Sequence, residues 1–303
     1  VTVANPRVPA QAAAFHAALP NAQGLIGSSF PIDAAVLDRA PRLEVISSIS
    51  VGVDNYPLSA LHARGILLCH TPGVLTETTA DPLFGLIMVS SRRLVELARE
   101  GREGRCHRNW GEELFGGDVH GKTLGILGFG RIGQALARRA ALGFGMPVLY
   151  HSRHPVDLEN AAPELAGKAR HTPLDELLAR ADIVAAVLPL SALTRGLMGE
   201  REFGLMTPGA IFVNGSRGAV VREDALLQAL DHGTLRAAGL DVFATEPLPL
   251  DSPLRTHSRV TALPHIGSAT HETRHAMAVL ATTNLLQALA GETPAAVFDT
   301  AAN

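Results

Sequence analysis

Apolar and polar positions alternate along this chain in short blocks that predict strands and helices in turn. Short apolar runs have the length of buried strands, and the segments between them carry apolar residues at helical spacing. Strands that alternate with helices are typical of parallel sheets joined by helical crossovers. The pattern therefore predicts an α/β fold with two doubly wound domains. The expected strands are 1–4, 24–27, 44–49, 66–69, 123–127, 147–150, 169–171, 183–188, 210–214, 238–242 and 260–263, and the expected helices are 10–19, 32–40, 58–64, 77–99, 131–142, 174–179, 200–205, 223–232 and 270–289.

The order of these elements also predicts how the chain is divided. The last helix is long enough to return to the first domain, so we expect residues 1–74 and 272–303 to form one domain and residues 75–271 the other. The chain starts already inside a strand, and a doubly wound domain would normally have one more βα unit before this strand. We therefore expect the N-terminal βα unit of the first domain to be missing.

Two details concern the long helix expected at 77–99. Pro82 lies in its second turn, where we expect it to kink the helix or to delay its start. The polar, glycine-rich stretch 101–117 that follows is expected to be a surface excursion, serving as a lid or as the arm of a homodimer.

A glycine motif follows the strand expected at 123–127 and opens the next helix. Gly128 suits a tight turn, Gly130 allows the backbone to approach a pyrophosphate, and Gly133 allows the helix to pack close to the strand. The N-terminus of that helix offers free N–H groups to phosphates. This context predicts a Rossmann-type dinucleotide-binding domain, and the first domain is then expected to be flavodoxin-like. The alternative is a glycine-rich turn with a purely structural role.

The residues after the second strand of this domain indicate which dinucleotide is bound. An acidic residue about 20 positions after the first glycine would bind the ribose 2′-hydroxyl of NAD. Here Ser152 and Arg153 occupy that place, and the first acid is Asp157. A hydroxyl and a forked cation suit a 2′-phosphate, so we expect NADP(H) to be preferred, with NAD(H) as the alternative cofactor. Arg153 as a solvated loop residue is the competing interpretation.

Composition and charge exclude several classes of partner. The net charge is −3 and aromatic residues make up 4%, which argues against nucleic acid as a partner. No apolar run approaches the length of a membrane span, so we expect no membrane partner. Two cysteines, Cys69 and Cys106, are too few for a disulfide framework. We expect a cytoplasmic protein.

Three expected strand ends carry isolated polar residues. Arg217, Glu246 and His265 each follow a different strand of the second domain, at the sheet edge where doubly wound folds bind ligands. An arginine can bind a carboxylate through two parallel hydrogen bonds, and a histidine supported by a carboxylate is a proton donor. Beside a dinucleotide site, these groups predict hydride transfer to an α-keto acid. The loop at Val51 and Gly52 follows a strand of the first domain and is either an anion site or an ordinary tight turn.

These motifs resemble those of the D-isomer-specific 2-hydroxyacid dehydrogenases and, within that family, the bacterial glyoxylate/hydroxypyruvate reductases, which are also called 2-ketogluconate reductases. The resemblance runs over nearly the whole chain. Its motifs are ISVGVDN (49–55), HTPGVLTETTAD (70–81), GILGFGRIG (125–133), VNGSRG (213–218), GLDVFATEP (239–247) and the segment 251–274 with PHIGSATHETR at its end.

The resemblance implies roles for individual residues. Arg217 would bind the substrate carboxylate and carbonyl, Glu246 would support the histidine, and His265 would be the acid–base. Backbone groups at Val51 and Gly52 would hold the carboxylate. Asp241 would orient the nicotinamide carboxamide and Thr79 would line the cofactor. The full set of expected cofactor contacts is Thr79, Gly128, Gly130, Arg131, Ile132, Gly133, Ser152, Arg153, Leu188, Pro189, Thr194, Gly215, Ser216, Asp241, His265 and Gly267.

The resemblance also implies an activity. It is the NADPH-dependent reduction of small 2-keto acids to D-2-hydroxy acids, with glyoxylate and hydroxypyruvate as first candidates and 2-ketogluconate as a further one. Residues 1–74 and 272–303 would then be the substrate domain, and a homodimer is expected.

Two other functions compete with this one. His271, Glu272 and His275 fit the HExxH helix of zinc proteases, but a third ligand is not evident and we expect no metal. A non-enzymatic scaffold is the other alternative, since the C-terminal binding protein corepressors use a related fold to bind peptides. Those corepressors bind NAD, whereas the pattern at Ser152 and Arg153 favours NADP(H).

Overall fold

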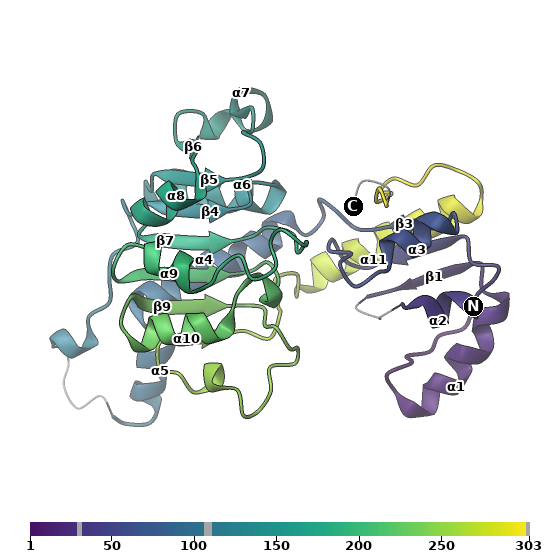
Figure 1. Ribbon diagram of the computed structural model, residues 1–303, viewed down its shortest axis with the longest axis horizontal. Helices are drawn as coiled ribbons and strands as arrows, with labels where there is room; N and C mark the ends of the chain where they lie inside the picture. Colours follow the sequence, from purple (N-terminus) through teal and green to yellow (C-terminus); the bar gives the residue numbers. More distant parts are fainter. Residues whose placement is uncertain (29–31, 106–110, 301–303) are drawn as a thin grey trace. The chain divides into compact units, whose positions relative to one another are not determined.

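The computed structural model describes residues 1–28, 32–105 and 111–300. The chain forms two compact units, one made of Val1–Leu75 with Thr270–Asn303 and the other of Thr76–Ala269. Each unit contains one parallel β-sheet with helices packed on it (Figure 1). The predicted α/β class with two parallel sheets is confirmed. The functional roles expected for the two parts of the chain stay a prediction.

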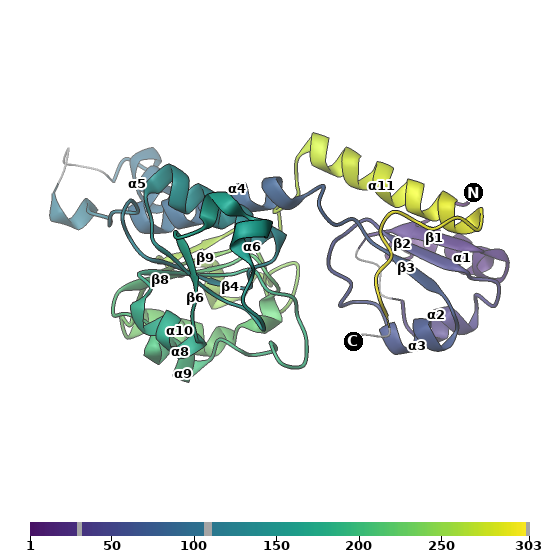
Figure 2. The same cartoon turned by 90° about the horizontal axis from the view of Figure 1, so that it is seen from above.

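The first unit has a three-stranded sheet in the order β1-β2-β3, covered on both faces. The long helix α11 packs along one face, and α2 and α3 lie on the other (Figure 2). A buried hydrogen bond of 2.7 Å from the Ser47 hydroxyl to the Ala281 carbonyl ties the central strand to α11. The bounds are α1 Pro9–Ala18, β1 Gly24–Gly27, α2 Ala34–Asp38, β2 Val45–Ser48, α3 Leu58–Ala63, β3 Leu67–Cys69 and α11 His271–Leu289.

The strand expected at residues 1–4 is absent, and that prediction is wrong. Residues 1–5 have no regular secondary structure, and the side chains of Val1 and Val3 are exposed to solvent. An apolar run forms a strand only where it gains both ladder partners and burial, and these valines gain no burial.

The second unit has a seven-stranded parallel sheet in the order β10-β9-β8-β7-β4-β5-β6. The direction in which the chain builds the sheet reverses beside β4, which lies between β5 and β7, and ligands bind at such switch points. Helices α4 and α6 lie on one face, and α8, α9 and α10 lie on the other (Figure 2). The strands are β4 Leu124–Leu127, β5 Val148–His151, β6 Ala169–His171, β7 Ile183–Ala186, β8 Ala210–Asn214, β9 Leu235–Leu240 and β10 Val260–Ala262. The helices are α4 Thr76–Arg92, α5 Leu94–Arg102, α6 Arg131–Arg138, α7 Leu158–Ala161, α8 Leu174–Arg180, α9 Glu200–Leu205 and α10 Glu223–Asp231.

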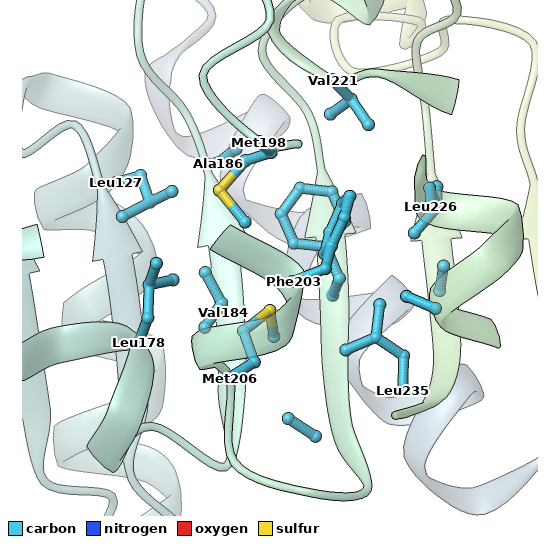
Figure 3. Close-up of a cluster of buried hydrophobic side chains, with 14 of the residues drawn as sticks. Leu127, Leu178, Val184, Ala186, Met198, Phe203, Met206, Val221, Leu226 and Leu235 are labelled. Carbon is cyan, nitrogen blue, oxygen red and sulfur yellow. The ribbon is translucent and has the colours of Figure 1, made fainter. Parts of the chain in front are cut away.

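The hydrophobic core of this unit explains why its central strands read as unbroken apolar runs. Both faces of β7 and β8 are covered, and all of their residues are buried. On one face Phe203 of α9 packs edge-on against Phe212, with ring centroids 5.3 Å apart, among methionine and leucine side chains (Figure 3). The strands are therefore fixed in place, and the loops at their carboxyl ends start from rigid positions.

The single helix expected at 77–99 is two helices, which corrects that prediction. Arg93 adopts a left-handed backbone, with φ of 55°, and separates α4 from α5. Its guanidinium donates to the Glu96 carboxylate and, at 2.6 Å, to the Glu113 carbonyl, so side-chain bonds accompany the break. Pro82 lies inside α4 and does not delay its start at Thr76. The expected arm at 101–117 begins in α5 and includes a 3-10 turn at Glu112–Leu114, while its residues 106–110 lie outside the described part.

Among the described residues, no helix combines the length and the apolar character that crossing a bilayer requires.

Candidate active site

Arg217, Glu246 and His265 lie in three loops that leave the carboxyl ends of neighbouring strands. Arg217 follows β8, Glu246 follows β9 and His265 follows β10, and these strands are adjacent in the sheet. The sheet therefore brings to one edge three residues that are spread over 48 positions of the sequence, from 217 to 265. No local sequence signal spans that separation.

A glycine allows two of these loops to touch. A Cβ atom added to Gly218 would overlap the carbonyl carbon and oxygen of Phe243. Only a residue without a side chain permits this contact between the loop after β8 and the loop after β9. Gly218 was not expected to have this role, although its position directly after Arg217 in a strand-end loop was a usable signal.

The loop that carries Arg217 is held by a buried asparagine. The side-chain oxygen of Asn214 accepts bonds from the Ser216 N–H at 3.0 Å and from the Ser216 hydroxyl at 2.6 Å. Its amide group donates to the Arg217 carbonyl at 3.1 Å. Asparagine bonding to its own backbone two residues later is a common turn device. Asn214 was not among the predicted site residues, and this turn preference could have identified it.

The loop that carries His265 is held by a buried aspartate. The two carboxylate oxygens of Asp241 accept bonds from the N–H groups of Ile266, at 2.7 Å, and Gly267, at 2.9 Å. Burial raises the pKa of Asp241, and these two backbone bonds act in the opposite direction. Asp241, predicted as a cofactor contact, therefore has a positioning task that the sequence did not reveal.

The His265 imidazole is paired with Glu246. The distance from His265 Nδ1 to Glu246 Oε2 is 2.8 Å, and Glu246 Oε1 accepts the Phe243 N–H at 3.0 Å. A carboxylate oxygen cannot donate when ionised, so Nδ1 carries a hydrogen and Nε2 is left for a ligand. His265 has a left-handed backbone, with φ of 55°, which is uncommon for a residue other than glycine and typical of functional sites.

The surroundings of His265 and Glu246 favour the charged form of both groups. The hydrogen bond with Glu246 raises the pKa of His265, although burial works in the opposite direction. Burial also works to raise the pKa of Glu246, but its bonds with His265 and the Phe243 N–H outweigh this and the pKa is lowered. Arg217 is close enough to lower the pKa of both groups. The arrangement favours a protonated imidazole beside a guanidinium, which together suit a substrate with a carboxylate and an adjacent carbonyl.

The glycine motif has the geometry that a dinucleotide requires. Gly128 has φ of 94°, a conformation that favours glycine, and lies at the end of β4. A Cβ atom on Gly133 would overlap the Gly128 carbonyl, so α6 packs tightly on this turn. Gly130 is exposed, and nothing lies within 4 Å of the place where its Cβ would be. Arg131 and Ile132 begin α6, whose N-terminal N–H groups suit a pyrophosphate.

The loop after β5 holds the residues that are expected to choose the cofactor. Arg153 is exposed, and the Ser152 hydroxyl donates to the His154 carbonyl at 2.7 Å, which gives it a task within the loop. Nε2 of His171, at the end of β6, is 3.0 Å from the Ser152 carbonyl. The loop is therefore tied to the neighbouring strand, with a cation at its tip.

The remaining predicted cofactor contacts fall into small groups. Thr79 and Asp241 both lie 3.2 Å from the place of a Cβ on Gly267. Leu188 lies against Gly128, and the Thr194 hydroxyl donates to the Pro189 carbonyl at 2.7 Å. Gly215 and Ser216 belong to the loop that Asn214 holds, and a Cβ on Gly215 would overlap Leu83 of α4. All of these residues lie in the second unit.

Val51 and Gly52 lie in the first unit, in the loop after β2. The carbonyl oxygens of both residues have side-chain partners, His70 for Val51 and Ser50 for Gly52. Side chains therefore hold both carbonyl groups of this loop, and its role as an anion site stays a prediction.

The HExxH residues begin α11. His271, Glu272 and His275 are exposed on that helix. Among the described residues, no group of three or more histidine, cysteine, aspartate or glutamate side chains is placed to hold a metal ion.

Comparison with known proteins gives related sequences over most of the chain. Residues 84–267 match the family model described as D-isomer specific 2-hydroxyacid dehydrogenase, NAD binding domain. Glyoxylate/hydroxypyruvate reductase B of Escherichia fergusonii is 52% identical over 274 residues, which cover 90% of this chain and 83% of the relative. The Yersinia pestis protein of the same name is 53% identical over 275 residues, covering 91% and 83%.

Solved structures agree with this result. The TT0316 protein of Thermus thermophilus matches with a TM-score of 0.86 at 43% identity, covering 98% of this chain and 90% of that one. The NADPH-dependent glyoxylate/hydroxypyruvate reductase of Sinorhizobium meliloti, solved with NADP and malonate, has a TM-score of 0.85 at 32% identity, covering 94% and 86%.

The contact between Glu246 and His265 can be tested by titration. We expect Glu246→Gln to lower the pKa of His265, because the neutral amide no longer favours the charged imidazole. Titration of the His265 ring signals by NMR would measure the change. Glu223→Gln is a matched control, since that carboxylate accepts the nearby Ala244 N–H at 2.7 Å. An unchanged titration midpoint in Glu246→Gln would contradict the assigned role of the carboxylate.

Proposed function

Because this chain belongs to the D-isomer specific 2-hydroxyacid dehydrogenase family, we propose that it reduces small 2-keto acids to D-2-hydroxy acids with NADPH. The observation that carries the proposal is the His265–Glu246 pair, 2.8 Å apart, at the sheet edge that also presents Arg217. Glyoxylate and hydroxypyruvate are the first candidate substrates, since relatives that are 52% identical are named as reductases of these two acids. 2-Ketogluconate is a further candidate.

The chemistry requires one hydride and one proton. The reduced nicotinamide supplies the hydride to the keto carbon when the cofactor is bound. His265, held by Glu246 through Nδ1, donates the proton from Nε2 to the carbonyl oxygen, so the carbonyl becomes a hydroxyl group. Arg217 binds the substrate carboxylate and polarises the adjacent carbonyl. Since His265 must be protonated to donate, its raised pKa keeps it active to higher pH, and reduction should slow as pH rises through that pKa.

Two substitutions separate binding from proton transfer. Arg217→Ala should raise the KM for glyoxylate about 10- to 100-fold, because a charge-assisted contact to the carboxylate is lost. His265→Ala should mainly lower kcat, by about 100- to 10,000-fold. Steady-state NADPH oxidation measures both, with His232→Ala, an exposed histidine of the same unit, as the control.

Two outcomes would count against this function. Near-normal turnover by His265→Ala would remove histidine as the proton donor. If the wild-type protein oxidised no NADPH with glyoxylate, hydroxypyruvate or 2-ketogluconate, the non-enzymatic scaffold would be favoured instead.

We propose NADPH as the preferred cofactor on the strength of the loop after β5. Its exposed tip carries Arg153 and contains no carboxylate to repel a 2′-phosphate. The Sinorhizobium meliloti relative, at 32% identity, is NADPH-dependent and was solved with NADP.

The cofactor preference can be tested at Arg153. Arg153→Ala should raise the KM for NADPH about 10- to 100-fold and leave the KM for NADH unchanged, because only NADPH carries the 2′-phosphate. A kcat/KM comparison of the two cofactors is the measurement. Arg170→Ala, which removes an exposed arginine of β6 that is paired with Glu176, is the control. Equal losses for both cofactors would contradict the assignment.

We propose that residues 1–74 and 272–303 serve as the substrate domain and residues 75–271 as the dinucleotide-binding domain. The family match at 84–267 and the glycine motif support the second assignment, and the Val51–Gly52 loop supports the first. The unpaired thiol of Cys69 supports a cytoplasmic location.

We propose a homodimer formed through α5 and the described residues 111–117. Large apolar side chains are exposed there: Leu94 and Val95 by 46% and 52%, and Phe115 by 59%. Sedimentation equilibrium should give twice the 31.9 kDa chain mass, and Val95→Glu should give the single chain. Leu250→Glu, at another exposed leucine, should stay dimeric. A monomeric wild-type protein would refute this assembly.

A further inference from the structure

Two carbonyl groups of the loop after β2 are held by side chains. The Val51 carbonyl oxygen lies 3.1 Å from Nδ1 of His70, and the Gly52 carbonyl accepts the Ser50 hydroxyl at 2.6 Å. A carbonyl can only accept, so Nδ1 of His70 must carry a hydrogen. His70 is the first residue of the 70–81 motif, and no function was expected for it from the sequence.

The direction of these carbonyls fixes the direction of the N–H groups. In a planar trans peptide the C=O and the following N–H point to opposite sides. With the Val51 carbonyl turned to His70, the Gly52 N–H points away from the imidazole. With the Gly52 carbonyl turned to Ser50, the Val53 N–H points away from that hydroxyl. Successive backbone N–H groups of a turn are a common way to bind an anion, so a loop whose carbonyls are held in this way suits a carboxylate.

A chain of hydroxyl groups gives the Ser50 bond its direction. The Tyr56 hydroxyl donates to Ser48 Oγ at 2.9 Å, and Ser48 Oγ and Ser50 Oγ are 2.8 Å apart. Each hydroxyl has one hydrogen, so the sequence of donation runs from Tyr56 through Ser48 and Ser50 to the Gly52 carbonyl. Ser48 is fully buried and Tyr56 nearly so, and hydrogen bonds in series strengthen one another in such surroundings.

The C-terminal part of the unit holds His70 itself. The His70 N–H donates to the Ala296 carbonyl at 3.2 Å, and the His70 carbonyl accepts the side-chain amide of Asn284 at 3.1 Å. Asn284 lies fully buried in α11 and also accepts the Ala296 N–H at 3.2 Å. The Phe298 ring meets the imidazole edge-on, with centroids 5.4 Å apart. The imidazole is therefore fixed on its backbone and on its ring.

We propose that His70 is a positioning residue for the substrate, which together with Ser50 holds the Val51–Gly52 loop in the conformation whose N–H groups meet the carboxylate of the 2-keto acid. This inference rests on the proposed reductase function and adds to it the residues that set the affinity for the acid. His70 acts through the loop and does not itself contact the reacting atoms.

The test compares substrate affinity with cofactor affinity. His70→Ala should raise the KM for glyoxylate about 3- to 10-fold, the loss of one oriented hydrogen bond, with the KM for NADPH and kcat unchanged. The inhibition constant of oxamate, a carboxylate that is not reduced, should rise by the same factor. His70→Asn should restore both values to within about twofold, because its amide nitrogen can take the place of Nδ1.

Further variants keep the proposal open to refutation. Ser50→Ala removes the second bond without touching His70 and should also raise the KM for glyoxylate, so it carries the test if His70→Ala does not fold. His62→Ala changes an exposed histidine of α3 and should leave every constant unaltered.

The outcomes distinguish this inference from the proposed function. An unaltered glyoxylate KM in both His70→Ala and Ser50→Ala, or equal losses for glyoxylate and NADPH, would overturn the positioning role while the reductase function stands. A wild-type protein that reduces no keto acid would remove the proposed function before the variants are compared.

Discussion

The candidate active site depends on a buried carboxylate that belongs to one strand and holds the loop of the next. Asp241, at the end of β9, accepts the backbone N–H groups of Ile266 and Gly267 after β10. These bonds satisfy the charge of a side chain that is 3% exposed, and they fix the backbone immediately after His265. The left-handed conformation of His265 is held from one side by Asp241 and from the other by Glu246. A strained residue persists only where its surroundings determine it in this way.

The same principle applies to the other loops of the site. Asn214 orders the Arg217 loop with three hydrogen bonds, and Gly218 allows this loop to touch the backbone after β9. In the first unit, His70 and Ser50 order the Val51–Gly52 loop in a comparable manner. For the Arg217 and His265 loops, the residue expected to meet a ligand is exposed or half-buried, while the side chain that orders its loop, Asn214 or Asp241, is buried. Buried side chains thus make these loops rigid, while more accessible residues are left to meet the ligand.

Much of the fold could be predicted from the sequence because apolar runs and glycine positions are local signals. The strands β6 and β8 begin and end where the pattern places them, and the glycine turn at Gly128 lies between β4 and α6 as expected. The run at Val1 and Val3 misled because apolar character alone does not supply a ladder partner or burial. The break at Arg93 was missed because the bond of its guanidinium to the Glu113 carbonyl, 20 positions away, depends on tertiary structure.

The residues expected to react with a ligand could be predicted from the sequence, and most of the side chains that hold their loops could not. Arg217, Glu246 and His265 stood out as polar residues after apolar strands. The bonds made by Asp241 and His70 reach backbone groups far along the chain, and a sequence carries no mark of which distant backbone group a side chain will meet. The local turn at Asn214 did carry such a mark. Similarity to known proteins identifies the family. The hydrogen bonds of the structure explain why Asn214, Asp241 and His70 stand where they do.

The division of the chain has a consequence for its synthesis on the ribosome. The second unit is one continuous segment, Thr76–Ala269, whereas the first needs α11, which is made last. Until residues 271–289 emerge, one face of the β1-β2-β3 sheet, with Ser47 on its central strand, lacks its cover. The seven-stranded sheet can therefore complete its folding during translation, and the β1-β2-β3 sheet becomes stable only afterwards. The nascent chain must keep that uncovered face out of contact with other chains until α11 is made.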